Sequence, residues 1–297
     1  SSDLTKTGDV YKVYTPFWKS LSTDFAPTKA LSAPKSFVSY SNSLPSDDLR
    51  DWKLHPEKPD WSKGFAAEWQ PGEVGAHARL KTFLKAALKS YADDRNRPDR
   101  SGTSRLSPHL HFGEITPGQC WSAAVHAAQR GSGFDKGCET FLKELVWREF
   151  SNTLLFYWPD LPEQPFRKDF RAFPWRKDAV HLKAWQRGET GYPIVDAGMR
   201  ELWHTGYMHN RVRMIVASFL IKHLLVPWQE GEAWFWDTLV DADLANNAAS
   251  WQWVAGSGAD AAPYFRIFNP ITQGLKFDPD GVYTRRWVPE LAKLPDD

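Results

Sequence analysis

One helical stretch of the sequence gathers polar and aromatic side chains on a single face. In the amphipathic run from Lys136 to Trp158, the residues Glu144, Trp147 and Arg148 stand at positions i, i+3 and i+4, and Ser151 follows at i+7. This spacing puts all four on one side of an α-helix. Such a face can hydrogen-bond the edge of a base, stack against it and hold a phosphate. The alternative is a surface salt bridge beside an exposed indole.

A second stretch repeats this arrangement with different chemistry. From Met208 onward, Asn210, Arg213 and Met214 fall at i, i+3 and i+4. The opposing apolar stripe consists of Val212, Ile215, Val216 and Phe219. The two polar faces are suited to line one cavity, although amphipathicity alone does not establish that they face each other.

Hydroxyl groups are concentrated in the turn-forming segment TSRLSP, residues 103–108. Hydroxyls and free backbone N–H groups in a turn are good phosphate ligands. The alternative is a simple helix-capping loop rich in Ser and Thr. The segment lacks the glycines of the Walker and Rossmann loops, so neither of those nucleotide-binding motifs is predicted.

Carboxylates and amides alternate in a further segment, DADLANN, residues 241–247. Asp is the usual acceptor for ribose hydroxyl and adenine amino groups in nucleotide sites, so Asp241 and Asp243 are candidate nucleotide ligands. Calcium is the rival reading, but the spacing lacks the Gly at position six and the Glu at position twelve of an EF-hand. His109 and His111 lack a carboxylate or thiolate partner at ligand spacing. No metal site is expected.

Composition narrows the class of protein. The chain has 297 residues, 42% of them hydrophobic and 25% charged, with a formal net charge of +1. Any nucleic-acid site must therefore be a local basic patch. No apolar run approaches the roughly 18 residues of a membrane helix, and the polar start is unlike a signal peptide. Because there are only two cysteines, we expect a reduced, cytoplasmic protein without a disulfide scaffold.

The 16 tryptophans are the unusual feature of this composition. Indoles serve as stacking platforms, as cofactor walls or as carriers in an electron path. The alternative is that they only fill the core, as aromatic side chains do in many proteins.

The elements that would position these residues are predicted to be helical. Residues 1–75 are rich in Pro, Ser and Asp with isolated Trp anchors, which predicts an irregular wrap rather than a flexible linker. Residues 76–297 are predicted to form one helical domain. Its helices are expected around 80–91, 116–130, 136–158, 193–205, 208–226 and 230–240. No period-2 strand pattern occurs, so we predict an all-α fold, an irregular helical cluster.

Five segments in register resemble the photolyase/cryptochrome family, and most of all its bacterial cyclobutane pyrimidine dimer photolyases. They are TSRLSPHL (103–110), WREF (147–150), GYPIVDAGMRELWHTGYMHNRVRM (191–214), DADLANNAASWQW (241–253) and DAAPYFRIFNP (260–270). Their order and spacing are similar to those of the family's FAD-binding helical domain, over about residues 10–297.

The resemblance implies FAD as cofactor. The positions similar to the family's flavin contacts are Tyr91, Thr103, Ser104, Arg105, Leu106, Ser107, Arg213, Asp241 and Asp243, with Asn247 facing flavin N5. The walls of the dimer pocket correspond to Glu144, Trp147, Asn210, Met214 and Trp253. The DNA contacts correspond to Arg95, Arg148, Arg211 and Gln273, and the tryptophan chain that reduces the flavin to Trp251, Trp228 and Trp175.

The implied function is light-driven DNA repair by a deoxyribodipyrimidine photo-lyase, a carbon–carbon lyase that splits pyrimidine dimers by electron transfer from FAD. The implied partner is dimer-containing DNA, bound by a monomer. Base flipping by photolyases is a known property of the family. If burial keeps Glu144 protonated, its carboxyl can donate a hydrogen bond to the dimer.

Three rival functions are weighed against this one. A cryptochrome-type blue-light sensor shares the flavin site but does no repair, and plant-type sensors often carry Asp where this chain has Asn247. A six-four photolyase uses two His where this chain has Asn210 and Met214. A plain DNA-binding helical module leaves the 241–247 segment unexplained.

Two departures from the family pattern stand out. The family's N-terminal α/β domain has no counterpart in these 297 residues, so an antenna chromophore is expected only in that missing domain. Phe141 and Tyr207 occupy positions where relatives often have Trp, and both substitutions keep an aromatic ring.

Overall fold

The computed structural model describes residues 4–27, 31–39 and 44–295. Residues 1–3, 28–30 and 40–43 of the predicted wrap, and residues 296–297, lie outside the described part. Within the described residues every regular element is a helix, and the only β pairing is an isolated bridge between Leu4 and Val10. The predicted all-α fold is confirmed.

The N-terminal half of the molecule is a helical layer built around one long helix. Its helices are α1 (Tyr14–Asp24), α2 (Phe65–Glu68), α3 (Glu73–Ala86), α4 (Tyr91–Asp94), α5 (Ser107–His111), α6 (Pro117–Gln129) and α7 (Asp135–Tyr157). The predicted N-cap Thr116 begins α6, and it forms a reciprocal capping box with Gln119. Helix α7, which carries the first polar face, packs against α4, α6 and α1.

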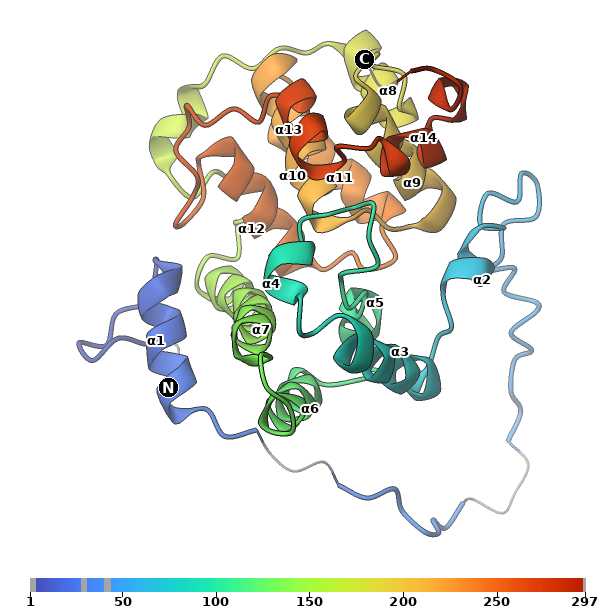
Figure 1. The fold of residues 1–297 in the computed structure, drawn as a ribbon, viewed down its shortest axis with the longest axis vertical. Helices are drawn as coiled ribbons and strands as arrows, with labels where there is room; N and C mark the ends of the chain where they lie inside the picture. The colour runs from blue at the N-terminus through green and yellow to red at the C-terminus, as the bar shows by residue number, and fades with distance from the viewer. Residues whose placement is uncertain (1–3, 28–30, 40–43, 296–297) are drawn as a thin grey trace.

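The C-terminal half stacks on this layer in Figure 1. It contains η1 (Lys168–Ala172), α8 (Ala179–Arg187), α9 (Pro193–Thr205), α10 (Asn210–Ser218), η2 (Phe219–His223), α11 (Trp228–Thr238), α12 (Leu244–Ala255), α13 (Pro270–Phe277), α14 (Val282–Trp287) and η3 (Pro289–Leu291). Its core includes Trp185, Trp228 and Trp251, so part of the tryptophan excess fills this core. Helix α12 packs against α7 and joins the two halves.

The predicted helix at 208–226 is shorter and less regular than expected. It begins at Asn210 and continues beyond Ser218 as a π-helical turn, in which the Leu224 N–H donates to the Phe219 carbonyl. At the junction of the α-helical and π-helical parts, Ser218 Oγ accepts from the Phe268 N–H of a distant loop. Leu225, with φ of +58°, then ends the element. Such turns are common at functional sites.

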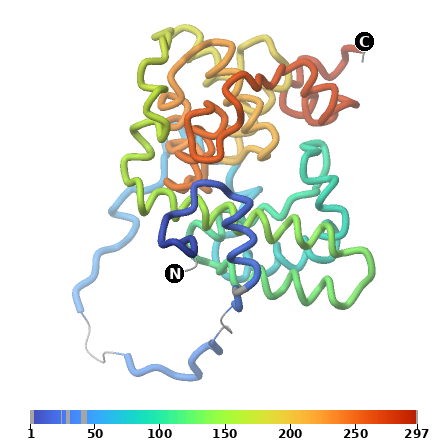
Figure 2. Tube along the Cα trace, turned by 90° about the vertical axis from the view of Figure 1, so that its left-hand side faces the viewer, coloured from blue at the N-terminus to red at the C-terminus, as the bar shows by residue number. Residues whose placement is uncertain are grey.

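The predicted irregular wrap contains one substantial helix that the sequence analysis missed. Helix α1 packs its residues Tyr14, Phe17 and Leu21 against the α7 side chains, and Figure 2 shows it beside the green helices. Between α1 and α2 the described residues form no helix and run along the outside of the molecule. Helix α3 starts at Glu73, before the predicted boundary at 76, and the division into two domains remains a prediction.

None of the helices in the described part of the chain is long and apolar enough to cross a membrane.

Candidate functional site

A cavity of about 520 Å³ lies where the two halves meet. This size is typical of ligand and cofactor pockets. Nearly all the predicted site residues line it: Tyr91, Arg95, Thr103, Ser104, Arg105, Leu106, Ser107, Glu144, Trp147, Arg148, Asn210, Arg211, Arg213, Met214, Asp241, Asp243, Asn247, Trp251 and Trp253. The two polar helix faces, on α7 and α10, therefore do face one cavity.

Three of the predicted residues do not line the cavity. Trp228 is 1% exposed in the core of the C-terminal half. Trp175 is half-buried at the edge of the same core, next to Phe173. Gln273 lies on α13, with its Oε1 buried and without a hydrogen-bond partner in the described structure.

Arg105 marks one end of the cavity. Its backbone is held at φ of +50°, a left-handed conformation that is strained for a residue with a side chain. Its guanidinium lies over the rings of Trp69 and Tyr207, and its Nη1 donates to Glu68 Oε2 at 2.9 Å. Its Nε is buried without a partner in the described structure. The loop 103–107 is therefore fixed in shape, with one strong donor still unused.

Arg213 and Asp241 form an ion pair on the cavity wall. Arg213 Nη2 lies 3.1 and 2.9 Å from the two carboxylate oxygens of Asp241, whose side chain is 3% exposed. Arg213 Nε also donates to the Met208 carbonyl at 2.7 Å. Burial, the largest single influence, acts to lower the pKa of Arg213, but the charge and hydrogen bond of Asp241, with Tyr207 and Glu201, together outweigh it and the pKa is raised. The guanidinium on this wall is therefore paired before any ligand binds.

Asp243 shapes the start of α12. Its Oδ1 accepts from the backbone N–H of Asn246 at 2.9 Å and from the Asn246 side chain at 2.6 Å, which makes it the helix N-cap. Its Oδ2 pairs with Arg148 Nη1 at 3.2 Å. Arg148 was expected to contact DNA, but it lies beside Asp243, a residue predicted to bind the cofactor. A cofactor group bound by Asp243 would therefore share that carboxylate with Arg148.

Asn247 and Trp251 project from α12 one turn apart. Asn247 Nδ2 donates to the carbonyl and the Oε1 of Glu232 on α11, at 2.9 and 3.0 Å. Burial raises the pKa of Glu232. Trp251 is 2% exposed and packs against Gly231, where an added Cβ would lie 2.1 Å from the indole. The amide orientation and the indole position are both set by contacts with α11.

Glu144 has a partner that the sequence analysis did not foresee. Arg95 Nη1 donates to Glu144 Oε1 at 2.5 Å, and the Arg95 guanidinium lies over the Tyr91 ring at 5.7 Å. Glu144 accepts this hydrogen bond, whereas the sequence analysis considered a donating role for a protonated carboxyl. Their side chains are 23% and 30% exposed, so an incoming ligand can reach both.

Trp147 is held flat by Tyr14, a residue of α1 that the sequence analysis missed. The two rings are parallel within 5°, with centroids 3.6 Å apart. The Tyr14 hydroxyl donates to the Lys143 carbonyl at 2.7 Å, and this hydrogen bond fixes the position of the Tyr14 ring. Because one face of Trp147 is covered by Tyr14 and the residue lines the cavity, its indole is a ready stacking platform.

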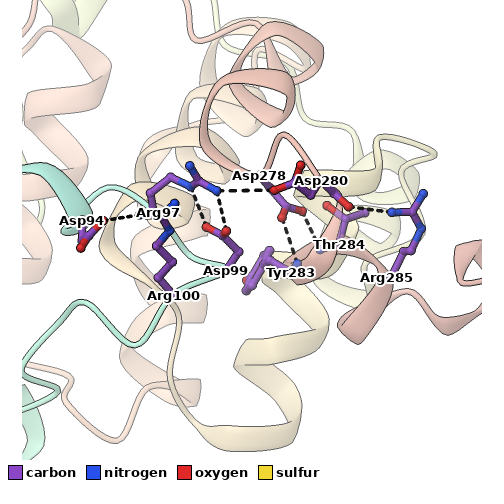
Figure 3. A network of polar contacts seen from close by, with 9 residues as sticks. All are labelled: Asp94, Arg97, Asp99, Arg100, Asp278, Asp280, Tyr283, Thr284 and Arg285. Atoms are coloured by element: carbon purple, nitrogen blue, oxygen red, sulfur yellow. Dashed lines mark hydrogen bonds and ion pairs between the residues drawn. The ribbon is translucent and has the colours of Figure 1, made fainter. Parts of the chain in front are cut away.

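The mouth of the cavity is held by a polar network across the two halves. Arg211 donates to Asn96 Oδ1 at 2.7 and 3.2 Å and lies over the Phe277 ring. In Figure 3, Arg97 reaches both Asp99, in two hydrogen bonds of 2.8 and 2.6 Å, and Asp280, 4.0 Å away in the turn before α14. The loop that carries Arg95 and Asn96 is thereby tied to the C-terminal half.

Two further residues of the site were also missed. Glu68, the partner of Arg105, lies in the segment predicted to be an irregular wrap, 37 residues from the loop it holds. Tyr207 lies beneath both Arg105 and Arg213, at 4.9 and 5.2 Å from its ring centroid. The aromatic character of Tyr207 was noted, but no local pattern signals either contact.

The donors and acceptors of the cavity fit the expected FAD. The unused Nε of buried Arg105, with the hydroxyls of residues 103–107, suits phosphate oxygens. Asp241 and Asp243 offer carboxylates to ribose hydroxyl or adenine amino groups, and the Asn247 side chain lines the same cavity. Among the described residues, no group of three His, Cys, Asp or Glu side chains is arranged to hold a metal ion.

Comparisons with known proteins agree with this geometry. The family described as the FAD binding domain of DNA photolyase matches residues 141–297. A deoxyribodipyrimidine photo-lyase of Agrobacterium fabrum is 56% identical over 290 residues, which cover 98% of this chain and 60% of that protein. Cryptochrome-1 of Arabidopsis thaliana is 40% identical over 296 residues, 98% of this chain and 43% of that protein.

The structural comparison gives the same result. A bacterial class III photolyase from Agrobacterium tumefaciens matches with a TM-score of 0.94 and 56% identity, over 98% of this chain and 60% of that one. The chain thus spans about 60% of the length of these two photolyases. The family description names FAD, and the expected cofactor is confirmed. The chain belongs to the family of the FAD-binding domain of DNA photolyase.

Proposed function

We propose that the protein to which this chain belongs is a light-driven DNA repair enzyme, a deoxyribodipyrimidine photo-lyase acting on cyclobutane pyrimidine dimers. The observation that carries the proposal is that one cavity has two kinds of lining residue. Some are suited to bind phosphate and ribose groups, and others are suited to stack on bases: Trp147, whose indole stacks on Tyr14, with Trp253 and Met214. This combination places a nucleotide cofactor next to a platform for unstacked bases.

FAD, when bound in reduced form, supplies an electron on excitation with blue light. The residues of this chain hold and surround the reactants. Arg105, Arg213 and the hydroxyls of residues 103–107 hold the phosphates, and Asp241 and Asp243 hold the ribose and adenine end. Asn247, oriented by Glu232, presents its amide to the flavin ring. Where these residues line the reactants, fixed protein dipoles take the place of mobile solvent around the reacting groups.

The dimer is held by a second set of residues. Trp147 and Trp253 stack on the flipped bases, while Asn210 and Met214 complete the pocket wall. The Glu144–Arg95 pair offers an acceptor and a cationic donor to base edges and carbonyl oxygens. These residues would hold the dimer while its two cyclobutane carbon–carbon bonds break, and FAD, when bound, would supply the one-electron chemistry for that cleavage. Arg148, Arg211 and Gln273 are proposed DNA contacts.

Trp251, Trp228 and Trp175 are the proposed carriers that reduce the cofactor before repair. Support comes from their shared core. Trp251 lines the cavity, Trp251 and Trp228 are buried in the same hydrophobic core, and the half-buried Trp175 packs against that core.

The second candidate is a cryptochrome-type light sensor, favoured by the 40% identity to cryptochrome-1. The residue at position 247 favours repair, since this chain has Asn and plant-type sensors often have Asp. We place the protein in the cell interior, where its proposed DNA substrate lies, and propose that it acts as a monomer.

The deciding experiment is a repair assay on thymine-dimer DNA with purified full protein, in light and in dark. We expect light-dependent restoration of normal thymines. Bound flavin without any restoration in light would assign the sensor function instead.

A further inference from the structure

The two indoles of the proposed dimer pocket come from different helices. Trp147 projects from α7 and Trp253 from α12, and both line the cavity. Two side chains that stack on one ligand need a fixed relative position. The packing of α7 against α12 supplies one connection between them. A second connection runs through the loop after α12 and the first residue of α1.

The loop of residues 256–262 is anchored on Trp253. The Trp253 carbonyl accepts from the Gly256 N–H at 3.3 Å, where the loop begins, and from the Ala262 N–H at 3.2 Å, where it ends. Between these two points, Ala259 lines the cavity. A displacement of this loop therefore acts on the residue that carries one of the two indoles.

The residue before Trp253 braces the start of this loop. Gln252 is 0% exposed, and its Nε2 donates to the Leu161 and Gln164 carbonyls at 2.6 and 2.9 Å. Its Oε1 accepts from the Phe166 N–H at 2.8 Å and from Ser257 Oγ at 3.3 Å. The loop is thus tied to the segment that follows α7 as well as to α12.

Asp260, within the loop, reaches the first turn of α1. Its Oδ2 accepts from the Tyr14 N–H at 3.0 Å, across 246 positions of the sequence. Val13, the N-cap of α1, makes no capping hydrogen bond with its side chain, so Asp260 supplies the missing acceptor. A carboxylate is also favoured at the positive end of a helix. Figure 1 shows the loop after α12 close to the upper end of α1.

Tyr14 transmits this contact to Trp147. Its ring lies parallel to the Trp147 indole, with centroids 3.6 Å apart, and its hydroxyl donates to the Lys143 carbonyl on α7. The residue is thus held at its hydroxyl end by α7 and at its backbone end by Asp260. Without Asp260 the backbone end loses its tie, and the support beneath Trp147 is no longer fixed relative to Trp253.

We propose that Asp260 is a positioning residue for lesion recognition, which sets the relative placement of Trp147 and Trp253 through Tyr14. The proposal rests on the proposed function, because it assigns these two indoles to the dimer. Asp260 acts here without any contact to DNA. The simpler alternative is a helix cap that only stabilises α1, and such a cap would leave the selectivity for damaged DNA unchanged.

The backbone of Asp260 allows a matched pair of variants. Its φ is +48°, a left-handed conformation that Asn and Asp adopt more readily than other residues with a side chain and that glycine adopts without strain. Asp260→Asn therefore keeps the backbone and an acceptor, whereas Asp260→Gly keeps the backbone and removes the acceptor. The control is Asp178→Ala, which removes the N-cap of α8, a helix with no residue in the cavity lining.

The test measures selectivity, defined as the ratio of the dissociation constants of the full protein for undamaged and dimer-containing duplexes. In Asp260→Gly the ratio is expected to fall by roughly twofold to thirtyfold, the range that the loss of one capping hydrogen bond spans. Asp260→Asn and Asp178→Ala should stay within about twofold of the unsubstituted protein. Bound FAD should be unchanged in all three variants.

Two further readings follow the contact itself. Hydrogen exchange of the α1 amides should be faster in Asp260→Gly and unchanged in Asp260→Asn. Tyr14→Ala combined with Asp260→Gly should lose no more selectivity than Tyr14→Ala alone, because both substitutions act through the same ring.

Unchanged selectivity in Asp260→Gly overturns the proposal and leaves Asp260 as a cap of α1 only. An equal loss in Asp260→Asn overturns it as well, since the charge and not the hydrogen bond would then matter. Additive losses with Tyr14→Ala, or a loss of FAD, would show that Asp260 acts by another route.

Failure of the proposed function is a different result, because the unsubstituted protein would then bind both duplexes equally. In that case the role of Asp260 in lesion recognition is contradicted too, while faster exchange of α1 in Asp260→Gly still identifies Asp260 as the residue that holds Tyr14.

Discussion

The two parts of the cavity differ in how their charges are paired. On the cofactor side, Arg213 has a carboxylate and a carbonyl as partners, and its carboxylate Asp241 is 3% exposed. On the substrate side, Arg95 and Glu144 have one short contact between half-buried side chains. The first arrangement is complete before any ligand binds, whereas the second can exchange its contact for a ligand. A permanently bound cofactor suits the former, and a substrate that enters and leaves suits the latter.

The largest effect on one function alone is expected for Trp251→Phe. Trp251 belongs to the cofactor side, and phenylalanine keeps most of its packing against Gly231 while removing the easily oxidised indole. We expect normal FAD binding, loss of photoreduction of oxidised flavin, and normal repair once the flavin is reduced chemically. Absorption spectra recorded during illumination measure both the bound FAD and its photoreduction. Photoreduction at the normal rate would remove Trp251 from the electron path.

Asp241→Ala tests whether the cofactor side is preassembled. It leaves the Arg213 charge without its carboxylate, which is expected to cost about 3 kcal/mol of folding free energy and to weaken FAD binding at least tenfold. Urea unfolding and flavin titration measure the two losses. Asp241→Asn, which keeps an acceptor, should lose less. If the Ala variant retains FAD as tightly as the native chain, the 241–247 segment is not a cofactor ligand.

Trp147→Ala tests the substrate side. Loss of the stacking platform should weaken binding of dimer-containing DNA by roughly 1–3 kcal/mol and leave FAD content unchanged. Undamaged DNA should be affected much less. Tyr14→Ala, which removes the ring behind Trp147, should give a smaller loss in the same direction, whereas Tyr14→Phe keeps the stack. Equal weakening on damaged and undamaged DNA would make Trp147 a general contact.

His209, the buried N-cap of α10, predicts a pH dependence. Burial, with the charges of Arg213 and Arg211, lowers its pKa to about 3, and its Nδ1 accepts from the Arg211 N–H at the start of α10. Below pH 6.5 the unfolded chain binds a proton that the folded chain refuses, so stability falls as the pH is lowered. The loss from this group is about 2 kcal/mol at pH 5. His209→Asn, which keeps an N-cap acceptor, should flatten this part of the stability curve. A native curve that is already flat between pH 6.5 and 5 would contradict the assignment.

The smallest effect is expected for Asn96→Ala at the mouth. Arg211 would lose its two hydrogen bonds to the Asn96 amide but keep its contact with Phe277. A loss of roughly 0.5–1.5 kcal/mol in DNA affinity is expected, with unchanged FAD content. Fluorescence anisotropy with dimer-containing duplex measures it. A loss of FAD would show that the Arg211–Asn96 contact also supports the cofactor side, so that the two parts of the cavity do not act independently.

The sequence predicted the parts of the site that depend on local spacing. The shared face of Glu144, Trp147 and Arg148, and the bounds of α9, follow from helix periodicity and from capping by Pro193 and Gly206. Contacts between distant segments could not be predicted in this way. Tyr14 meets Trp147 across more than 130 residues, and Asn96 meets Arg211 across 115. Only tertiary packing brings such pairs together.

The π-helical turn and the partner of Glu144 were missed for related reasons. Beside the change from α to π register, Ser218 Oγ accepts from the Phe268 N–H, 50 residues further along the chain. The partner of Glu144 is Arg95, which comes from a segment 49 residues away. Local spacing shows which side chains share one helix face, but it does not show which distant segment meets that face.

The stacking of Tyr14 on Trp147 bears on where this catalytic unit can be cut. The family match covers residues 141–297, yet the ring that supports the indole, the carboxylate that holds Arg105 and the whole 103–107 loop lie before residue 141. A fragment trimmed to the matched segment would keep one wall of the cavity and lose the other. For dissection or transplantation into another scaffold, the smallest autonomous piece must therefore reach back at least to α1.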